Sequence, residues 1–169
     1  RQGWIEAPYV TLPAGIDGIL AGAVPVSGQG SGQGSSPARK IRILPGLAQR
    51  SSDDPDVMRG EETQILGCGV EGTVCLPGTH SKWVEVKNGR IERFCTFMTG
   101  EVYALLKQHS ILGRMMQDGP PDAGAFAEGV QRSGEGGGLL HHLFGVRTRG
   151  LMGELAPAAS SLYLSRIII

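Results

Sequence analysis

Residues 82–94 read Lys-Trp-Val-Glu-Val-Lys-Asn-Gly-Arg-Ile-Glu-Arg-Phe, the strongest short structural signal in the chain. Asn88-Gly89 lies between two strand-like runs, and Asn-Gly is the dipeptide that best supports the positive φ angles of a tight hairpin turn. We therefore expect paired strands over residues 82–86 and 90–94. Just upstream, the apolar run 73–76 predicts another short strand that leads into Pro77-Gly78-Thr79.

Helices are expected on both sides of this hairpin. A helix that opens at Asp56 or Arg59 and runs to Gly67 would carry Glu61 and Glu62 in its first turn, where carboxylates complement the positive end of the helix dipole. After Thr99, apolar residues recur at helical spacing. The helices expected there are 99–112, 126–132, 139–144 and 156–169, with the glycine-rich run 134–138 as an interruption.

The first third of the chain is less regular. Residues 16–26 fit either a short helix or a pair of strands, and residues 27–38 are low complexity, which predicts an exposed flexible loop. Residues 39–44 alternate basic and apolar side chains like a half-buried strand, which Pro45-Gly46 is expected to end. Strands and a hairpin followed by helices favour an α/β fold class.

Composition narrows the classes of partner. The 169 residues include 16 basic and 16 acidic side chains, so no global field steers the protein toward nucleic acid or an anionic membrane. No apolar run approaches the roughly 20 residues that span a bilayer. We expect a cytoplasmic protein that binds neither nucleic acid nor membrane.

Three cysteines, Cys68, Cys75 and Cys95, form an odd set without paired spacing. This pattern indicates neither a disulfide framework nor a zinc site, and no metal-ligating residues are predicted. We expect the cysteines to be small buried side chains in a reducing compartment. His141-His142 does not indicate a metal site either, because adjacent residues on a helix do not face one another. One histidine is expected to be buried and the other exposed.

Residues 59–67 read Arg-Gly-Glu-Glu-Thr-Gln-Ile-Leu-Gly and place two carboxylates at a helix start. A hydroxyl that attacks a γ-phosphate needs a carboxylate within hydrogen-bond reach to orient it and accept its proton. Glu61 and Glu62 are therefore candidate catalytic bases. The plainer alternative is helix capping, which acidic residues provide in many proteins.

The next candidate is the run Gly78-Thr79-His80-Ser81-Lys82. Backbone N–H groups in a glycine turn, a hydroxyl and a lysine can together hold phosphate oxygens. The spacing is not that of the Walker motif. A simple tight turn, with Lys82 as a solvated strand residue, is the alternative. A carboxylate upstream of a loop that can hold phosphate nevertheless suggests a kinase.

The N-terminal segment holds a dense polar and aromatic cluster of Arg1, Gln2, Trp4 and Glu6. An arginine can clamp a substrate carboxylate through two parallel hydrogen bonds, and a tryptophan can stack on a sugar face. The alternative is a fraying terminus with one buried aromatic side chain.

Five segments, taken together, resemble the 2-dehydro-3-deoxygalactonokinase (2-keto-3-deoxygalactonokinase) family. They are Arg-Gln-Gly-Trp-Ile-Glu-Ala-Pro-Tyr at 1–9, Asp-Val-Met-Arg-Gly-Glu-Glu-Thr-Gln at 56–64, Leu-Pro-Gly-Thr-His-Ser-Lys-Trp at 76–83, Phe-Met-Thr-Gly-Glu at 97–101 and Leu-Met-Gly-Glu-Leu at 151–155. The resemblance implies the actin-like sugar kinase superfamily, with two ribonuclease H-like domains around a cleft. It also implies phosphorylation of the 6-hydroxyl of 2-dehydro-3-deoxy-D-galactonate by ATP and Mg²⁺, a step of galactonate degradation.

The resemblance also implies roles for individual residues. The run 60–64 is similar to the Gly-Asp-Gln-Gln stretch of glycerol kinase-type enzymes, whose aspartate is the catalytic base, so Glu61 is the expected base and Glu62 the reserve. Gly78 and Thr79 match the second phosphate motif, which makes Ser81 and Lys82 expected phosphate contacts. The residues expected to bind the sugar acid are Arg1, Gln2, Trp4 and Glu6.

Two motifs of the superfamily are not found in the sequence: the first phosphate loop, Asp-x-Gly-Thr, and the glycine-rich adenosine motif. The chain therefore resembles the middle of such a kinase, and we expect an internal fragment that is inactive alone. Residues 1–57 would be the C-terminal part of domain I and residues 58–169 the first part of domain II. The open alternatives are a kinase for a related keto-deoxy sugar acid, a non-catalytic sugar-acid-binding fragment, and a plain structural domain. The oligomeric state also stays open, with a homodimer as one option.

Overall fold

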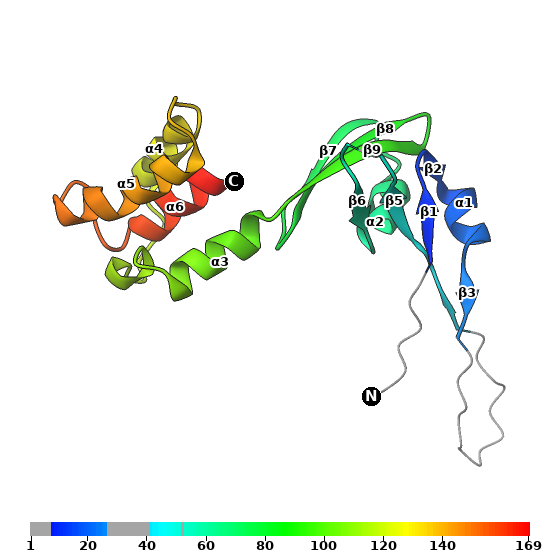
Figure 1. Cartoon of the computed structure of the whole chain (residues 1–169), viewed down its shortest axis with the longest axis horizontal. Coiled ribbons are helices and arrows are strands. Elements are labelled where there is room, and N and C mark those ends of the chain that lie inside the picture. The colour runs from blue at the N-terminus through cyan, green and yellow to red at the C-terminus, as the bar shows by residue number, and fades with distance from the viewer. Residues whose placement is uncertain (1–7, 27–40, 52) are drawn as a thin grey trace, which may run out of the picture. The chain divides into compact units, whose positions relative to one another are not determined.

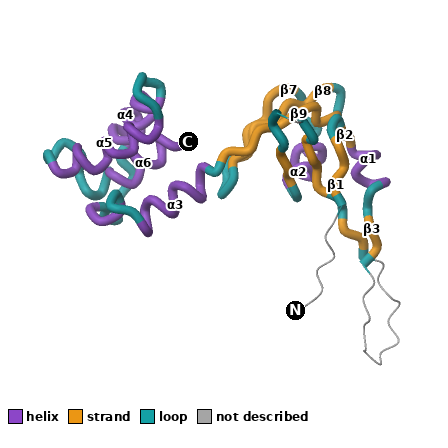
Figure 2. Tube along the Cα trace, in the orientation of Figure 1, coloured by secondary structure: helices purple, strands orange, loops and turns teal. Residues whose placement is uncertain are grey.

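The computed structural model describes residues 8–26, 41–51 and 53–169 (Figure 1). The chain divides into two compact units: unit 1 comprises Arg1–Leu76 and Lys82–Thr96, and unit 2 comprises Pro77–Ser81 and Phe97–Ile169. Strands lie mainly in unit 1 and helices mainly in unit 2 (Figure 2), which confirms the expected mixed α/β class. The loop expected at residues 27–38 lies outside the described residues, and the domain boundary expected at residues 57 and 58 stays a prediction.

Unit 1 contains three small sheets. The three-stranded sheet has the order β1-β5-β6, with β1 parallel to β5 and β6 antiparallel to it. A four-stranded sheet has the order β2-β9-β8-β7, and β3 pairs with β4. The strands are β1 (Tyr9–Thr11), β2 (Ala14–Gly15), β3 (Val24–Pro25), β4 (Arg42–Ile43), β5 (Gly46–Gln49), β6 (Asp56–Met58), β7 (Gly72–Leu76), β8 (Ser81–Lys87) and β9 (Arg90–Phe97).

The expected hairpin is confirmed as β8 and β9. Asn88 and Gly89 have φ angles of 52° and 68°, the pair of positive values that a type I′ turn requires. The Glu71 carboxylate accepts hydrogen bonds from the backbone N–H groups of Asn88 (3.0 Å) and Gly89 (2.7 Å). The turn is therefore held both by its own sequence and by a side chain that precedes β7.

Two helices, α1 (Ile16–Ala21) and α2 (Glu61–Cys68), belong to unit 1. The helix α2 buries Ile65 in a core that it shares with strands of both larger sheets. Burial of a side chain of this size contributes roughly 1.5–3 kcal/mol. This contact fixes the helix that begins with Glu61. The other fully buried members of the core include Leu47, Met58, Val84, Ile91 and Phe94.

One expected boundary, the helix start at Asp56, is wrong. Asp56 does not open a helix, because Asp56–Met58 forms β6 and pairs with β5 in the register Gln49↔Asp56, so α2 starts only at Glu61. The strand expected over residues 39–44 is described as β4, which ends at Ile43, before Pro45-Gly46, as expected. Gly46 then begins a separate strand, β5, where it pairs with Tyr9 of β1. At Asp56, pairing with a strand distant in sequence outweighs the local signal.

The cysteines also differ from expectation. Cys68 and Cys75 are exposed, Cys95 is half-buried, and all three are free. Cys68 is the last residue of α2 and Cys75 lies in β7 at a position that faces away from the core. The prediction of small buried side chains is therefore wrong at two positions. Whether a side chain is buried depends on the face of the helix or sheet on which it lies, and not on the residue type alone.

Unit 2 is built from helices around a second core. The expected helices are confirmed, with different ends: α3 (Thr99–His109), the short 3₁₀ turn η1 (Gly113–Met115), α4 (Ala123–Ser133), α5 (Leu139–Leu151) and α6 (Ser160–Ile168). Tyr163 and Leu164 of α6 lie at the centre of this core. The Asp122 carboxylate caps α4 by accepting a hydrogen bond from the N–H of Ala125 at 3.0 Å.

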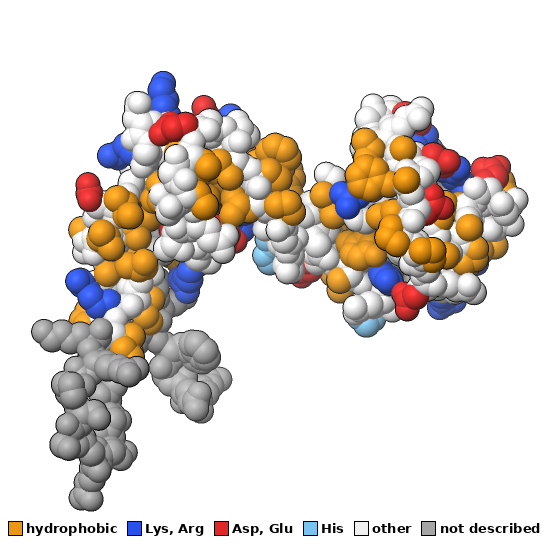
Figure 3. Space-filling view, turned by 180° about the vertical axis from the view of Figure 1, so that it is seen from behind, with side chains coloured by type: hydrophobic (Ala, Val, Ile, Leu, Met, Phe, Trp, Pro, Cys, Tyr) orange, Lys and Arg blue, Asp and Glu red, His pale blue; other side chains and the backbone are white. Residues whose placement is uncertain are grey.

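The helix α5 is apolar on two sides. It buries Leu143 and Val146 in the core but also exposes Leu140 and Phe144. Apolar side chains are visible on the face of the helices shown in Figure 3. His142 is buried, with its Nε2 3.0 Å from the carbonyl of Gly136, whereas His141 is exposed, as expected. Within residues 8–26, 41–51 and 53–169, no helix is long and apolar enough to cross a membrane.

Candidate active site

The start of α2 is shaped by Gly60 and Glu62. Gly60 has a φ of 108°, a conformation that glycine adopts far more readily than other residues. The Glu62 Oε2 atom accepts a hydrogen bond from the Gly60 N–H at 2.7 Å, and Glu62 is only 2% exposed. Burial raises the pKa of Glu62, and the backbone N–H groups of Glu62 and Gly60 offset part of that rise. Glu62 therefore closes the turn that leads into the helix.

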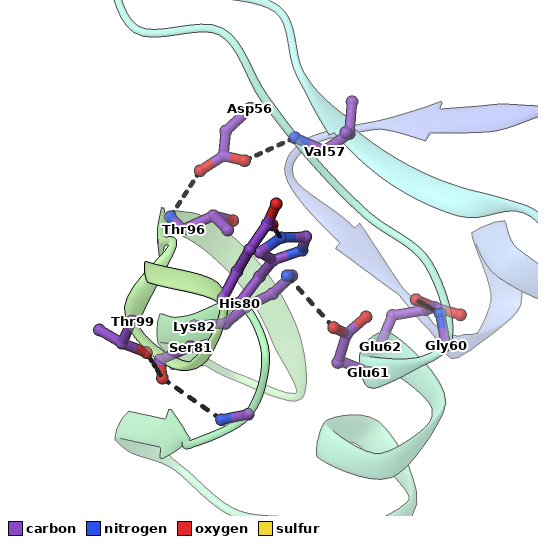
Figure 4. Close-up of polar contacts among 12 residues, drawn as sticks. Asp56, Val57, Gly60, Glu61, Glu62, His80, Ser81, Lys82, Thr96 and Thr99 are labelled. Carbon is purple, nitrogen blue, oxygen red and sulfur yellow. Dashed lines mark hydrogen bonds and ion pairs between the residues drawn. The ribbon is translucent and has the colours of Figure 1, made fainter. Parts of the chain in front are cut away.

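Glu61 has a different environment. Its side chain is 28% exposed, and its Oε1 atom lies 3.2 Å from the Nζ atom of Lys82 (Figure 4). Its other oxygen, Oε2, is buried and has no hydrogen-bond partner among the residues that the structure describes. A buried carboxylate oxygen without a donor is costly, so such atoms are few in folded proteins. Thr96 Oγ1 and Arg166 Nε are two other buried polar atoms without a partner among the described residues.

Lys82 is buried although it carries a charge. The residue is 4% exposed and lies near the start of β8, 21 positions after Glu61 in the sequence. An ammonium group is expensive to bury unless a charge or hydrogen bonds compensate it. The Glu61 carboxylate provides that compensation. The alternative of a solvated strand residue is therefore wrong for Lys82.

A third carboxylate, that of Asp56, joins the two larger sheets of unit 1. One of its oxygens accepts a hydrogen bond from the N–H of Val57 and the other from the N–H of Thr96, both at 2.7 Å (Figure 4). Asp56 thereby ties β6, the strand before α2, to the end of β9. The sequence does not predict this role, because an aspartate before an expected helix is typical of a helix cap.

An open cleft of about 670 Å³ lies beside β1, β5 and β6 of unit 1. Tyr9, Asp56 and Val57 are among the residues that line this cleft. The Arg59 guanidinium lies 4.7 Å from the centre of the Tyr9 ring, which is a cation–π distance. The other residues that line the cleft are Ala48, Gln49, Arg50, Ser51 and Pro55.

The predicted phosphate loop belongs to unit 2. Gly78, Thr79 and His80 are exposed, whereas Ser81 is 4% exposed. The Ser81 hydroxyl accepts a hydrogen bond from the N–H of Gly78 at 3.3 Å and lies 2.5 Å from the Thr99 hydroxyl. Ser81 therefore braces the loop from within, and the exposed backbone of Gly78 and Thr79 is the part that a ligand can reach.

The loop is fastened to the first turn of α3. The Thr79 carbonyl accepts a hydrogen bond from the N–H of Glu101 at 3.0 Å, and the Nε2 of His80 lies 2.5 Å from the Glu101 carboxylate. Gly100 packs directly on this loop. A Cβ atom there would lie 2.5 Å from the Gly78 carbonyl oxygen. In the sequence, residues 97–101 stand out only as a family segment, and the helix start expected at Thr99 is the signal for this contact.

The predicted site residues thus fall into three groups. Glu61, Glu62 and Lys82 meet in unit 1, whereas Gly78, Thr79 and Ser81 meet in unit 2. The residues expected to bind the sugar acid, Arg1, Gln2, Trp4 and Glu6, lie outside the described residues. Across the described ranges, no group of three or more His, Cys, Asp or Glu side chains could hold a metal ion.

Comparison with known proteins gives the family of this chain. The family model for 2-keto-3-deoxy-galactonokinase matches residues 1–169. The chain therefore belongs to the 2-keto-3-deoxy-galactonokinase family, and the expected family is confirmed.

Individual relatives agree with this assignment. The chain is 41% identical over 178 residues to the "Probable 2-dehydro-3-deoxygalactonokinase DgoK1" of Rhizobium meliloti (strain 1021), covering 100% of this chain and 56% of the relative. It is 35% identical over 170 residues to the 2-dehydro-3-deoxygalactonokinase of Escherichia coli (strain K12), covering 99% of this chain and 54% of that relative. The chain spans about half the length of both curated relatives.

A solved structure gives the same answer for the fold. A crystal structure from Sinorhizobium meliloti, of a protein provisionally assigned as a 2-dehydro-3-deoxygalactonokinase, matches this one with a TM-score of 0.85. The two sequences are 40% identical, and the match covers 99% of this chain and 56% of that chain. The mixed α/β arrangement is therefore shared with a crystal structure over half of its length.

Proposed function

We propose that this protein contributes to an ATP-dependent sugar kinase that phosphorylates the 6-hydroxyl of 2-dehydro-3-deoxy-D-galactonate, with Glu61 as the catalytic base. The observation that carries the proposal is the buried Oε2 atom of Glu61, which has no donor among the described residues. Family membership and the two relatives named for this activity support the substrate. The proposal includes the ribonuclease H-like, actin-like ATPase fold as the architecture of the complete kinase.

The two neighbouring glutamates differ in what their carboxylates already do. Glu62 is 2% exposed and its carboxylate accepts the hydrogen bond from Gly60 that closes the helix start. Glu61 keeps one oxygen on Lys82 and leaves the other without a donor. Oε2 is enclosed in this structure, so a substrate hydroxyl supplies the missing donor only after the side chains that cover it move aside. Hydrogen-bond reach is the first requirement for a general base. This difference favours Glu61 over Glu62.

The proposed phosphate contacts are Gly78 and Thr79, whose exposed backbone could receive the oxygens of ATP, with Ser81 as the brace of that loop. The proposed sugar-acid contacts are Arg1, Gln2, Trp4 and Glu6. The segment that carries them leads into Tyr9, which lines the cleft beside β6, and β6 is the strand that leads to α2. A mostly preformed concavity with a few polar groups is typical of small-molecule sites.

The chemistry requires proton transfer and an in-line displacement. Glu61 accepts the proton of the substrate hydroxyl, and the hydroxyl oxygen forms a bond to the γ-phosphorus of ATP. The bond from that phosphorus to the bridging oxygen breaks, and ADP leaves with the electron pair. Positioning and charge neutralisation account for most catalysis of this kind.

Kinases of this chemistry use Mg²⁺, which would neutralise charge on the phosphates of ATP. The described residues contain no cluster of carboxylates that fits such an ion. We therefore assign no residue of this chain to magnesium and no step to it.

The test is a coupled ADP-release assay on the polypeptide of the complete reading frame that contains these 169 residues. The acceptors are 2-dehydro-3-deoxygalactonate, its gluconate epimer and related hexonic acids. Turnover confined to the galactonate form is the expected result. Turnover of the epimer alone would mean that the protein is a sugar-acid kinase with a different substrate. Sugar-acid binding without ADP release would favour a non-catalytic binding protein.

The same assay tests the base. Glu61→Gln keeps the size of the side chain but removes its basicity, so kcat should fall about 10²- to 10⁴-fold while sugar-acid affinity changes little. Glu92→Gln is the matched control, because Glu92 is exposed on β9. Loss of activity in Glu62→Gln together with full activity in Glu61→Gln would move the base by one residue.

A further inference from the structure

We propose that Lys82 is a positioning residue that acts through Glu61: its ammonium group holds one oxygen of the carboxylate and thereby fixes the orientation of the other, the atom proposed to accept the substrate proton. This inference rests on the proposed function of Glu61. It differs from the phosphate contact predicted from the sequence, and the two roles lead to different kinetics.

The first argument is the asymmetry of the Glu61 carboxylate. Oε1 lies 3.2 Å from the Lys82 Nζ, whereas Oε2 is buried and lacks a donor among the residues described. An ion pair to one oxygen fixes the rotation of the carboxylate plane. The orientation of Oε2 is therefore set by Lys82 as well as by the backbone of α2.

The second argument is how firmly both ends of the pair are held. Glu61 is the first residue of α2, and α2 is anchored by buried Ile65 and by the Glu62 contact to Gly60. The Lys82 side chain is only 6% exposed, and its strand β8 is bonded to a neighbour on each side, β7 and β9. Rigid elements place a catalytic group more reproducibly than loops do.

The third argument is the energetic cost of separating Lys82 from Glu61. Its ammonium is buried, so release from Glu61 would leave two charges to be compensated anew, which is costly. The neighbouring residue Ser81 groups with unit 2, where its hydroxyl meets Thr99. Adjacent residues on the strand thus serve different groups: Ser81 braces the phosphate loop, and Lys82 holds the proposed base.

The experiment is a kinetic double-mutant cycle with Lys82→Met and Glu61→Gln in the complete protein, using ATP and the sugar acid that the wild type phosphorylates. Methionine preserves the length and apolar stem of lysine but removes the charge. Lys87→Met is the matched control, because Lys87 lies at the exposed end of the same strand. The ATP affinity of each variant is measured separately by titration calorimetry.

We expect Lys82→Met to lower kcat by about tenfold to 10³-fold, and by no more than Glu61→Gln does, with the KM for ATP changed less than about threefold. In the Glu61→Gln background, Lys82→Met should add almost no further loss, because two residues that act as one unit are not additive. The control Lys87→Met should retain wild-type kinetics.

A weaker ATP affinity in Lys82→Met, or a further large loss of kcat in the Glu61→Gln background, would overturn this inference and favour the phosphate contact. A wild-type protein that turns over no sugar acid would instead overturn the proposed function, and this inference with it. If Lys82→Met alone does not fold, the double variant, which has lost both charges, is compared with Glu61→Gln. Equal kcat and equal ATP affinity in those two proteins support the positioning role.

Discussion

Gly100→Ala tests how closely the predicted phosphate loop is packed on α3. A Cβ atom at residue 100 would lie 2.5 Å from the Gly78 carbonyl oxygen and 2.9 Å from the Thr79 Cα atom. Both neighbours are backbone atoms, so no side chain can rotate away. Restoring a contact of 3.4 Å would displace the loop or the helix by about 0.9 Å, which is the difference from the 2.5 Å distance.

The expected cost follows from two opposing effects. Overpacking of a well-packed contact costs about 1–3 kcal/mol, and the gain in helix propensity from glycine to alanine returns about 0.5–1 kcal/mol. The net destabilisation should be about 0–2.5 kcal/mol. Gly145→Ala in α5 is the matched control, since nothing lies within 4 Å of the added atom. That control should gain stability by up to about 1 kcal/mol.

The assay is urea unfolding followed by far-ultraviolet circular dichroism. Four of the longer helices, α3 to α6, lie in unit 2, so this signal reports mainly on the unit that contains both substitutions. The KM for ATP provides a second readout, and it should rise in Gly100→Ala alone if the loop binds phosphate. Equal midpoints for Gly100→Ala and Gly145→Ala would refute the packing argument.

Two further predictions concern the turn before α2. Burial raises the pKa of Glu62 above its ordinary value of 4.5, so the folded protein binds more protons than the unfolded protein between the two pKa values. The stability that comes from protonated Glu62 is therefore complete below pH 4.5. It is lost as pH rises through the pKa of the folded protein. The difference in unfolding free energy between wild type and Glu62→Gln should therefore shift in favour of the variant as pH rises, and a difference that does not change with pH would contradict the burial argument. Gly60→Ala should lower the free energy of unfolding by about 1–3 kcal/mol, because alanine resists a φ of 108°. Gly67→Ala within α2 is the control and should be neutral or stabilising. Equal urea midpoints for the two variants would contradict the strain argument.

Local signals predicted the elements whose causes are local. The Asn88-Gly89 turn needs only two residues that accept positive φ, and the structure confirms it. The helix expected from Asp56 shows the limit of that reasoning. Asp56 carries the side chain of a cap, but it pairs with Gln49 in a sheet, and its two carboxylate oxygens accept hydrogen bonds from the backbone N–H groups of Val57 and Thr96. Those partners become visible only once β5 and β9 are in place.

The candidate site likewise combines features with local causes and features that depend on tertiary contacts. Glu61 and Glu62 look equivalent in the sequence, since both are first-turn carboxylates. Their difference depends on Lys82, which is 21 positions away and reaches Glu61 only because the hairpin strand β8 lies near α2. The fastening of the loop by His80 and Glu101 depends likewise on the start of α3. The sequence therefore predicted which residue types to inspect, and tertiary contacts separate their roles.

The chain passes between the two units at three places, after Leu76, after Ser81 and after Thr96. Unit 2 therefore holds a short segment, Pro77–Ser81, that is flanked on both sides by strands of unit 1. A single cut cannot release unit 2 intact, because a polypeptide starting at Phe97 would lack its own predicted phosphate loop. Expression of residues 97–169 alone should thus give a protein that lacks the loop packed on α3. Restoring that loop would require residues 77–81 to be joined to the helices through a designed linker or by circular permutation.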